Sequence, residues 1–179
     1  MPARWLLHRI YAQNARGLYV RATAEAVREA AFLDGRARFW DAEEVRDLPA
    51  VPAPSIPLRY IFHGSFCGST LLARLLDQAG ASIVLREPQA YVDVANAAGR
   101  FLPMLSAAMA DMGAPDEAVV VKPTNWANTL IPLLTAPEYC ESAVFVSQPL
   151  PDFLRAVLRG GRDRLAYTAR GATHVTAKS

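Results

Sequence analysis

Residues 63–70 combine small residues with hydroxyl side chains, the types that bind phosphate or sulfate. The segment reads H-G-S-F-C-G-S-T and stands between an apolar run and an amphipathic pattern. At the start of a helix, free backbone N–H groups and the positive end of the helix dipole attract an anion. The glycines let the backbone approach that anion, and the last two hydroxyls can donate to it. We therefore expect an anion-binding loop formed by Gly64, Ser65, Phe66, Cys67, Gly68, Ser69 and Thr70.

The loop differs from the Walker pattern G-x-x-x-x-G-K-[ST] of ATP and GTP hydrolases. Its glycine spacing is one residue shorter, and no lysine precedes Ser69. Because that lysine contacts the β- and γ-phosphates, the difference disfavours a hydrolase and a nucleotide or small-molecule kinase. A kinase stays open as the less favoured alternative, and magnesium-dependent ATP binding would revive it.

The loop resembles the 5′-phosphosulfate loop of the sulfotransferase family. Residues 67–72, C-G-S-T-L-L, fall on S-G-T-T-L-L of that family, and residues 86–88, R-E-P, are similar to its K-E-P. The resemblance implies a P-loop fold that binds 3′-phosphoadenosine 5′-phosphosulfate as co-substrate. It further implies in-line transfer of the sulfuryl group to a hydroxyl or amine of a small-molecule acceptor, with no metal required.

Three residues would carry this chemistry. Glu87 would be the general base, because a neutral alcohol is a poor nucleophile; it could equally pair with Arg86 or cap the following helix. The family's basic residue, two before the glycine, falls on Phe66. The developing charge would then be stabilised by Lys122, whose ammonium would contact the sulfuryl group, or by His63. A solvated lysine at the sheet edge and a simply hydrogen-bonded histidine are the alternatives for these two residues.

The 3′-phosphate of the donor would lie near the segment after the fourth apolar run. Family members read R-D-P-R-D-x-x-x-S there, and here the first Arg falls on Ser147 and the last Ser on Ala156. We expect Ser147 and Arg155 at that phosphate, with three further arginines following. The departures at Phe66, Ser147 and Ala156 favour an alternative function, a catalytically inactive P-loop protein that binds anions or partners.

Alternating strand and helix patterns must position these residues. Continuous apolar runs, typical of parallel strands buried on both faces, occur at 58–62, 82–85, 118–121 and 143–146. Helices are expected directly after the loop and at about 89–98, 101–112, 126–135 and 152–167. The carboxyl ends of such strands face the ligand crevice. We predict an α/β fold with a three-layer parallel sheet of P-loop type over residues 58–179, possibly truncated relative to the family.

An N-terminal helical extension, 1–48, is expected to precede this domain. Residues 22–33 are rich in Ala and Glu, and Asp41 with Glu44 resembles a capping box that starts a short helix at about 42–48. Four prolines within residues 49–57 exclude a helix or a central strand. The sequence therefore predicts a proline-rich linker between the extension and the domain.

Composition limits the remaining possibilities. A chain of 179 residues, 52% hydrophobic and with a net charge of +2, indicates one globular domain and excludes disorder. Residues 152–179 hold six basic and two acidic side chains, which suits an anionic ligand but is too mild to imply nucleic acid. Two cysteines form neither a zinc site nor a disulfide framework, and no apolar run could span a membrane. We expect a cytoplasmic protein, with a second subunit, as in a homodimer, able to complete its pockets.

Overall fold

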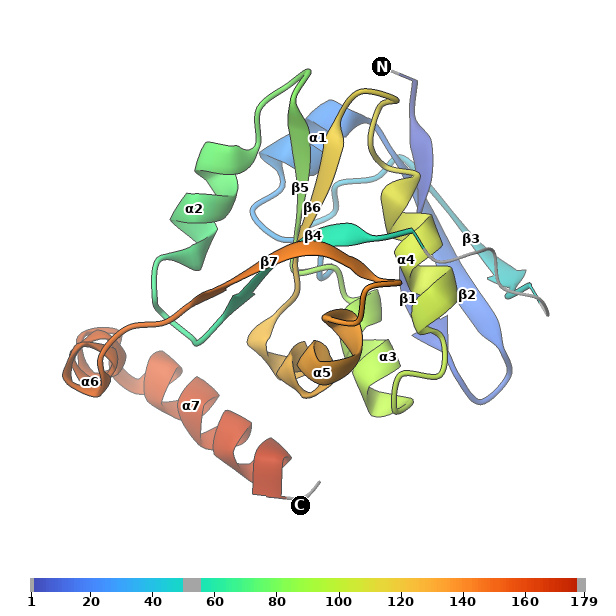
Figure 1. Ribbon diagram of the computed structural model, residues 1–179. Helices are drawn as coiled ribbons and strands as arrows, with labels where there is room; N and C mark the ends of the chain where they lie inside the picture. Colours follow the sequence, from blue (N-terminus) through green and yellow to red (C-terminus); the bar gives the residue numbers. More distant parts are fainter. Residues whose placement is uncertain (1, 50–55, 177–179) are drawn as a thin grey trace.

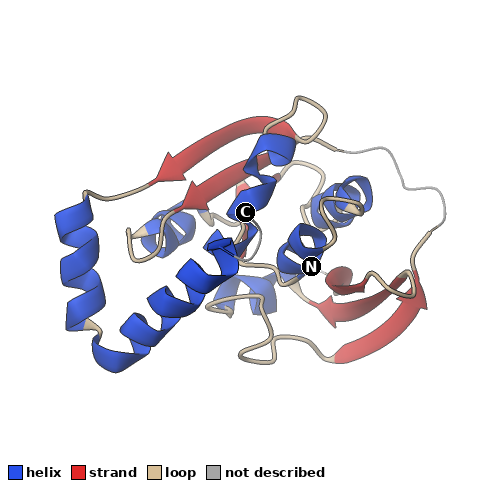
Figure 2. Cartoon of the chain, turned by 90° about the horizontal axis from the view of Figure 1, so that it is seen from below, coloured by secondary structure: helices blue, strands red, loops and turns tan. Residues whose placement is uncertain are grey.

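The computed structural model describes residues 2–49 and 56–176, and it contains two separate β-sheets (Figures 1 and 2). The first is antiparallel and has the order β1-β2-β3. Its strands are β1 (Arg4–Tyr11), β2 (Arg16–Ala22) and β3 (Ala42–Asp47). Helix α1 (Ala24–Glu29) follows β2, and the Thr23 hydroxyl caps it by accepting a hydrogen bond from the Ala26 N–H at 3.1 Å. The N-terminal segment is thus a small sheet with one short helix.

The predicted helix at 42–48 is wrong, because these residues form β3. Val45 pairs with Leu18 of β2, and most of the β3 side chains are exposed. Asp41 does not cap a helix; its carboxylate accepts from the Arg21 guanidinium at 2.9 and 3.0 Å. Pairing with a strand distant in sequence therefore outweighs the local capping signal. The helix predicted at 22–33 is also shortened, since Ala22 belongs to β2 and α1 ends at Glu29.

The second sheet is parallel and confirms the predicted α/β class. Its four strands fall on the four apolar runs and have the order β5-β6-β4-β7. They are β4 (Leu58–His63), β5 (Ser82–Arg86), β6 (Ala118–Lys122) and β7 (Cys140–Val146). Strands β4, β5 and β6 carry the buried side chains expected for a covered parallel sheet, whereas β7 is largely exposed.

Helices cover the two faces of the parallel sheet unequally. Helix α2 (Ser69–Leu76) packs Ala73 against Ile61, Val84 and Val120 on one face. The opposite face belongs to the main core, which it shares with the antiparallel sheet. The elements on that side are α3 (Ala90–Asn96), α4 (Leu102–Ala110), the 3-10 helix η1 (Asn125–Leu130) and α5 (Ile131–Leu134).

The N-terminal sheet and the parallel sheet share one hydrophobic core. Leu6 and Leu7 of β1 are fully buried in the same cluster as Leu85 of β5 and Leu105 of α4. Strand β1 contacts both α3 and α4. The N-terminal segment therefore packs directly on the parallel-sheet domain. Most of the predicted proline-rich linker, 49–57, lies outside the described residues.

The C-terminal helical region is a hairpin. The predicted helix at 152–167 is two helices, α6 (Leu150–Arg159) and α7 (Gly161–Thr176). Gly161, the first residue of α7, has a φ of +64°, a left-handed conformation that suits glycine. Both helices extend from β7 and lie beside the carboxyl edge of the parallel sheet (Figure 1). None of the described helices is long and apolar enough to cross a membrane.

Candidate functional site

A cavity of about 840 Å³ lies at the carboxyl edge of the parallel sheet. Strands β4 and β6 are neighbours there, yet the chain leaves β4 toward α2 on one face and leaves β6 toward η1 on the other. Such a point, where neighbouring connections diverge, is where open α/β sheets bind ligands. The lining comes from the loop after β4, the ends of β5 and β6, the loop before β3, and α7.

The glycine loop leaves the start of α2 without a side-chain cap. Gly68, with a φ of +83°, precedes the helix. The Cys67 thiol donates to the carbonyls of Gly64 (2.9 Å) and Val146 (3.2 Å), which ties the turn to the end of β7. Six of the seven predicted loop residues, 65–70, line the cavity. Gly64 does not line it; its N–H donates to the Val146 carbonyl at 3.0 Å.

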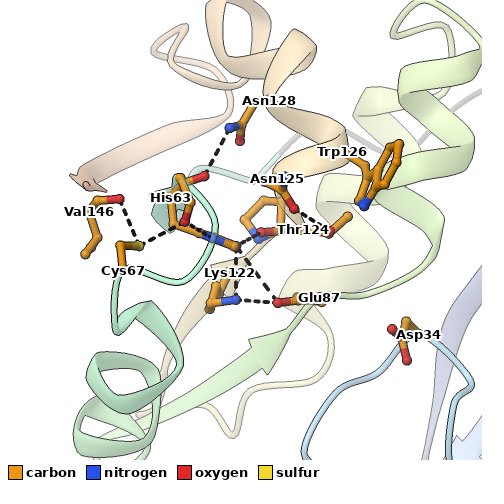
Figure 3. A network of polar contacts seen from close by, with 12 residues as sticks. Asp34, His63, Cys67, Glu87, Lys122, Thr124, Asn125, Trp126, Asn128 and Val146 are labelled. Carbon is orange, nitrogen blue, oxygen red and sulfur yellow. Dashed lines mark hydrogen bonds and ion pairs between the residues drawn. The ribbon is translucent and has the colours of Figure 1, made fainter. Parts of the chain in front are cut away.

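His63, Glu87 and Lys122, which come from three strand ends, meet beside this loop (Figure 3). The Lys122 Nζ lies 2.6 Å from Glu87 Oε1 and 3.0 Å from His63 Nε2. The Lys122–Glu87 pair arises from the register of β5 and β6, in which Arg86, the residue before Glu87, is opposite Lys122. The Glu87 N–H also donates to the Lys122 carbonyl at 2.7 Å. The sequence thus placed these three residues correctly at one edge.

Burial decides what each member of this cluster can touch. The Lys122 side chain has no exposed surface, whereas those of His63 and Glu87 are 6% and 14% exposed and line the cavity. Lys122 therefore lies behind the other two and does not face the cavity. The expected direct contact between its ammonium and a ligand is replaced by contacts with Glu87 and His63. Lys122 acts on the cavity by positioning its neighbours.

The imidazole of His63 is held in one orientation. Its Nδ1 lies 2.9 Å from the Gly64 carbonyl, and its Nε2 lies 3.0 Å from Lys122 Nζ and 3.1 Å from the Pro123 carbonyl. Burial, and then the positive charge of Lys122, lower the pKa of His63. The ring is consequently neutral near pH 7.

Glu87 is held from two sides and is not paired with Arg86. The Arg36 guanidinium lies 3.3 Å from Glu87 Oε2, opposite the contact with Lys122. Arg86 points away, and its guanidinium binds Asp77 at 3.0 Å. Glu87 has a φ of +55°, an uncommon conformation for a residue with a side chain. These constraints fix one carboxylate oxygen on Lys122 and leave the other toward the cavity and Arg36.

Helix α7 forms a wall of the cavity. The Tyr167 hydroxyl donates to Asn125 Oδ1 and accepts from the Trp126 Nε1 at 3.0 Å, which ties α7 to η1. The Arg164 guanidinium lies 4.8 Å from the centroid of the Phe66 ring, directly over the loop. Its Nη1 donates to the Ala156 carbonyl at 2.7 Å. The positive charge of Arg164 thus lies beside Phe66, the aromatic residue of the loop.

Two predicted binding residues are not brought to the cavity. Ser147 is exposed after β7, and Arg155 lies on α6, where it pairs with Asp152 at 2.6 Å. Neither is among the residues that line the cavity. The basic C-terminal segment does contribute, but through Arg164 and Arg170 of α7.

The loop before β3 contributes residues that the sequence did not indicate. Phe32, Asp34 and Arg36 line the cavity opposite the glycine loop. The Arg36 guanidinium stacks 4.0 Å from the Phe32 ring centroid and also pairs with Asp34. Phe32 falls within the helix predicted at 22–33, and Asp34 and Arg36 come directly after it, so only the packing of the N-terminal sheet brings them here. Nothing local in the sequence could have identified them.

No match was found when the chain was compared with family models, curated proteins and solved structures. Over residues 2–49 and 56–176, no group of three or more His, Cys, Asp or Glu side chains is placed to hold a metal ion. Fold and site together define a mixed α/β protein. Its cavity joins the glycine loop at the start of α2, a carboxylate and several arginines.

Proposed function

We propose that this chain is a sulfotransferase-like protein of P-loop type, in which α2 and the helices on the other face flank the parallel sheet as layers. It would bind 3′-phosphoadenosine 5′-phosphosulfate and transfer the sulfuryl group to a hydroxyl or amine of a small molecule. The observation that carries the proposal is the meeting of loop 65–70 with the Glu87 carboxylate in one cavity. Sulfuryl transfer to a neutral acceptor requires both an anion site and a nearby base.

The donor would be held by the loop and by α7. Ser69 and Thr70 line the cavity at the start of α2, and their hydroxyls with the free backbone N–H groups there would suit the 5′-phosphosulfate. Arg164, over Phe66, would supply the positive charge that the loop lacks. Trp126 and Tyr167 offer aromatic surface beside it. Charge stabilisation would thus come from a helix that lies about a hundred residues further along the chain than the loop.

The reaction would run between the loop and Glu87. The acceptor oxygen or nitrogen attacks the sulfur, and the bond from sulfur to the oxygen of the 5′-phosphate breaks. Glu87 takes the acceptor's proton, so the products are the sulfated acceptor and 3′-phosphoadenosine 5′-phosphate. Arg36, whose side chain is 60% exposed, would move from Glu87 Oε2 as the acceptor enters. Lys122 and the neutral His63 hold the carboxylate in place.

A catalytically inactive protein with the same anion site is the second candidate. The observations that favour it are the burial of Lys122 and the position of Ser147 and Arg155 outside the cavity. Loop, cavity and Arg164 serve such a binding function equally well. The two candidates differ only in whether the donor's sulfuryl group is transferred.

A ligand-binding measurement tests the anion site that both candidate functions share. Saturating 3′-phosphoadenosine 5′-phosphate, at about a hundred times its dissociation constant, should stabilise the protein by about 2.7 kcal/mol. For a chain of this size that is a rise in Tm of about 5–10 °C. Arg164→Ala should weaken the binding by about tenfold or more, because a hydrogen bond to a charged group contributes about 1.5–3 kcal/mol. Arg162→Ala is the matched control, since Arg162 is exposed on the same helix and does not line the cavity.

Turnover then separates the candidates. Release of 3′-phosphoadenosine 5′-phosphate from the donor, measured with a panel of phenols and amines, would support the transferase. Binding without any turnover would support the inactive protein. Absence of binding to the wild-type chain would overturn both, and magnesium-dependent ATP binding in its place would indicate a kinase.

A further inference from the structure

The Arg36 guanidinium occupies a cation site inside the cavity. It lies 4.0 Å from the centroid of the Phe32 ring, its Nε binds the Asp34 carboxylate, and its Nη2 lies 3.3 Å from Glu87 Oε2. An aromatic face and carboxylates are the groups that bind a planar guanidinium in proteins. All three partners line the cavity, and Asp34 lies beyond Glu87 on the side away from Lys122 (Figure 3).

The three partners are held in place by contacts that do not involve the Arg36 side chain. Glu87 is bound through Oε1 to the buried ammonium of β6 at 2.6 Å. The Asp34 carboxylate accepts a hydrogen bond at 3.1 Å from the backbone N–H of Arg36, which any residue except proline would donate. Phe32 precedes Leu33, which is fully buried and whose N–H donates to the last carbonyl of β5 at 2.7 Å. The cation site is therefore preformed, which lowers the cost of binding a ligand there.

The Arg36 side chain is easier to displace than its partners. It is 60% exposed, whereas those of Asp34 and Glu87 are 19% and 14% exposed. Ion pairs of an exposed side chain and its contact with an aromatic ring each contribute little. When the guanidinium moves away, the two carboxylates are left beside one ammonium, that of Lys122, and the cluster has an excess of one negative charge. A cationic group of a ligand would restore the balance.

We propose that Arg36 occupies the place of the acceptor, and that the acceptor is an alcohol that carries a guanidinium group. This inference rests on the proposed function. The acceptor's guanidinium replaces that of Arg36 on Phe32 and Asp34, and Arg36 leaves Glu87 Oε2. Glu87 then takes the proton of the acceptor's hydroxyl as its oxygen attacks the sulfur of the donor and the bond from that sulfur to the oxygen of the 5′-phosphate breaks. The base thus becomes available when a cation of the correct shape has entered.

The distribution of charge in the cavity suits such an acceptor. Arg164 lies over Phe66 of the glycine loop, where the anionic donor would bind. Asp34 and Glu87 line the side where the acceptor would enter. These carboxylates attract a cationic acceptor and repel an anionic one. A guanidinium has a flat face and donors along its edges, so it contacts a ring and a carboxylate at once, which a compact ammonium does less well.

A matched pair of alcohols tests the site by NMR titration without the donor. 4-Guanidino-1-butanol carries the proposed group, and 4-ureido-1-butanol has the same planar shape without the charge. The guanidino compound should bind at least about tenfold more tightly, and Asp34→Asn should remove most of this difference. Arg36→Ala should lower its dissociation constant by about tenfold, because the competing side chain is gone. Arg38→Ala is the matched control and should leave the constant unchanged, since Arg38 is exposed in the same loop but does not line this cavity.

The outcomes separate this inference from the proposed function. Circular dichroism verifies that the variants are folded. Equal affinity for the two alcohols, or weaker guanidino binding by Arg36→Ala than by the wild type, would overturn the inference, even in a chain that binds 3′-phosphoadenosine 5′-phosphate. A guanidino preference in a chain that does not bind this nucleotide would support the guanidinium site and overturn the proposed function. Where both bind, kcat/KM for sulfation should be at least about tenfold higher for the guanidino alcohol, and equal values would overturn its role as acceptor.

Discussion

Removal of either charge from the buried Lys122–Glu87 pair should destabilise the fold, and by unequal amounts. The ammonium has no exposed surface and lies 2.6 Å from the carboxylate. Breaking a buried pair costs about 3–5 kcal/mol, because the remaining charge stays out of water without a partner. Glu87→Leu leaves the fully buried ammonium, and we expect the whole of this cost.

Lys122→Met should cost less. The Glu87 side chain that remains is 14% exposed and keeps the Arg36 guanidinium at 3.3 Å, so that water and a second cation compensate part of the loss. We expect about 2–3 kcal/mol for this variant. The double variant replaces both charges by apolar groups and should be less destabilised than the sum of the two single variants, by about 2 kcal/mol or more.

Urea unfolding followed by circular dichroism measures these differences, and Tm should fall by about 2–4 °C for each kcal/mol. Arg21→Met is the control, because Arg21 and Asp41 form an exposed pair, 46% and 58% exposed, whose loss costs at most about 1 kcal/mol. A larger cost for Lys122→Met than for Glu87→Leu would refute the assignment of the ammonium as the more deeply buried charge. Strict additivity in the double variant would show that the two groups do not interact.

Three further changes test the packing around the site. Burial lowers the pKa of His63 and of His8. Below about pH 6.5 the unfolded chain therefore binds protons that the folded chain does not. The free energy of unfolding, measured by urea titration, should fall from pH 7.5 to pH 5.5, and it should fall less steeply in each His→Asn variant. Burial raises the pKa of Tyr60 to about 12 and also raises that of Tyr91. The free energy of unfolding should therefore decrease above about pH 10, where tyrosines of the unfolded chain ionise. The decrease should be smaller in Tyr60→Phe. A Cβ on Gly17 would lie 2.7 and 2.8 Å from two leucine side chains of the core, so Gly17→Ala should cost about 1–3 kcal/mol in thermal unfolding, and an unchanged Tm would contradict this packing.

The parallel sheet and the convergence of its strand ends follow from the sequence. Runs such as 118–121 have no polar side chain, and only a strand buried on both faces tolerates that composition. Parallel strands bring their carboxyl ends to one edge, so Glu87, Lys122 and the loop after β4 had to be neighbours. The strand order could not be predicted from the sequence. Because β6 lies between β5 and β4, Lys122 lies directly between Glu87 and His63.

The N-terminal half of the cavity could not be predicted, since distant contacts determine it. Residues 42–47 have the charge pattern of a helix start, but β2 offers a row of backbone hydrogen bonds that the isolated segment lacks. The break between α6 and α7 at Gly161 turns Arg164 toward the loop and leaves Arg155 outside. A single helix, as the sequence predicted, would have grouped these arginines on one solvated face.

The N-terminal sheet contributes to the cavity through the end of β5. The Leu33 N–H donates to the Arg86 carbonyl at 2.7 Å, and the Gln89 N–H donates to the Leu33 carbonyl at 3.3 Å. The buried Arg86 guanidinium in turn donates to the carbonyls of Val27 and Ala30. These bonds join the loop that carries Arg36 to the end of β5, directly before Glu87. Under the proposed function, the acceptor would thus enter between the N-terminal loop and Glu87, while the donor lies between α2 and α7, and acceptor selectivity would reside in the N-terminal segment.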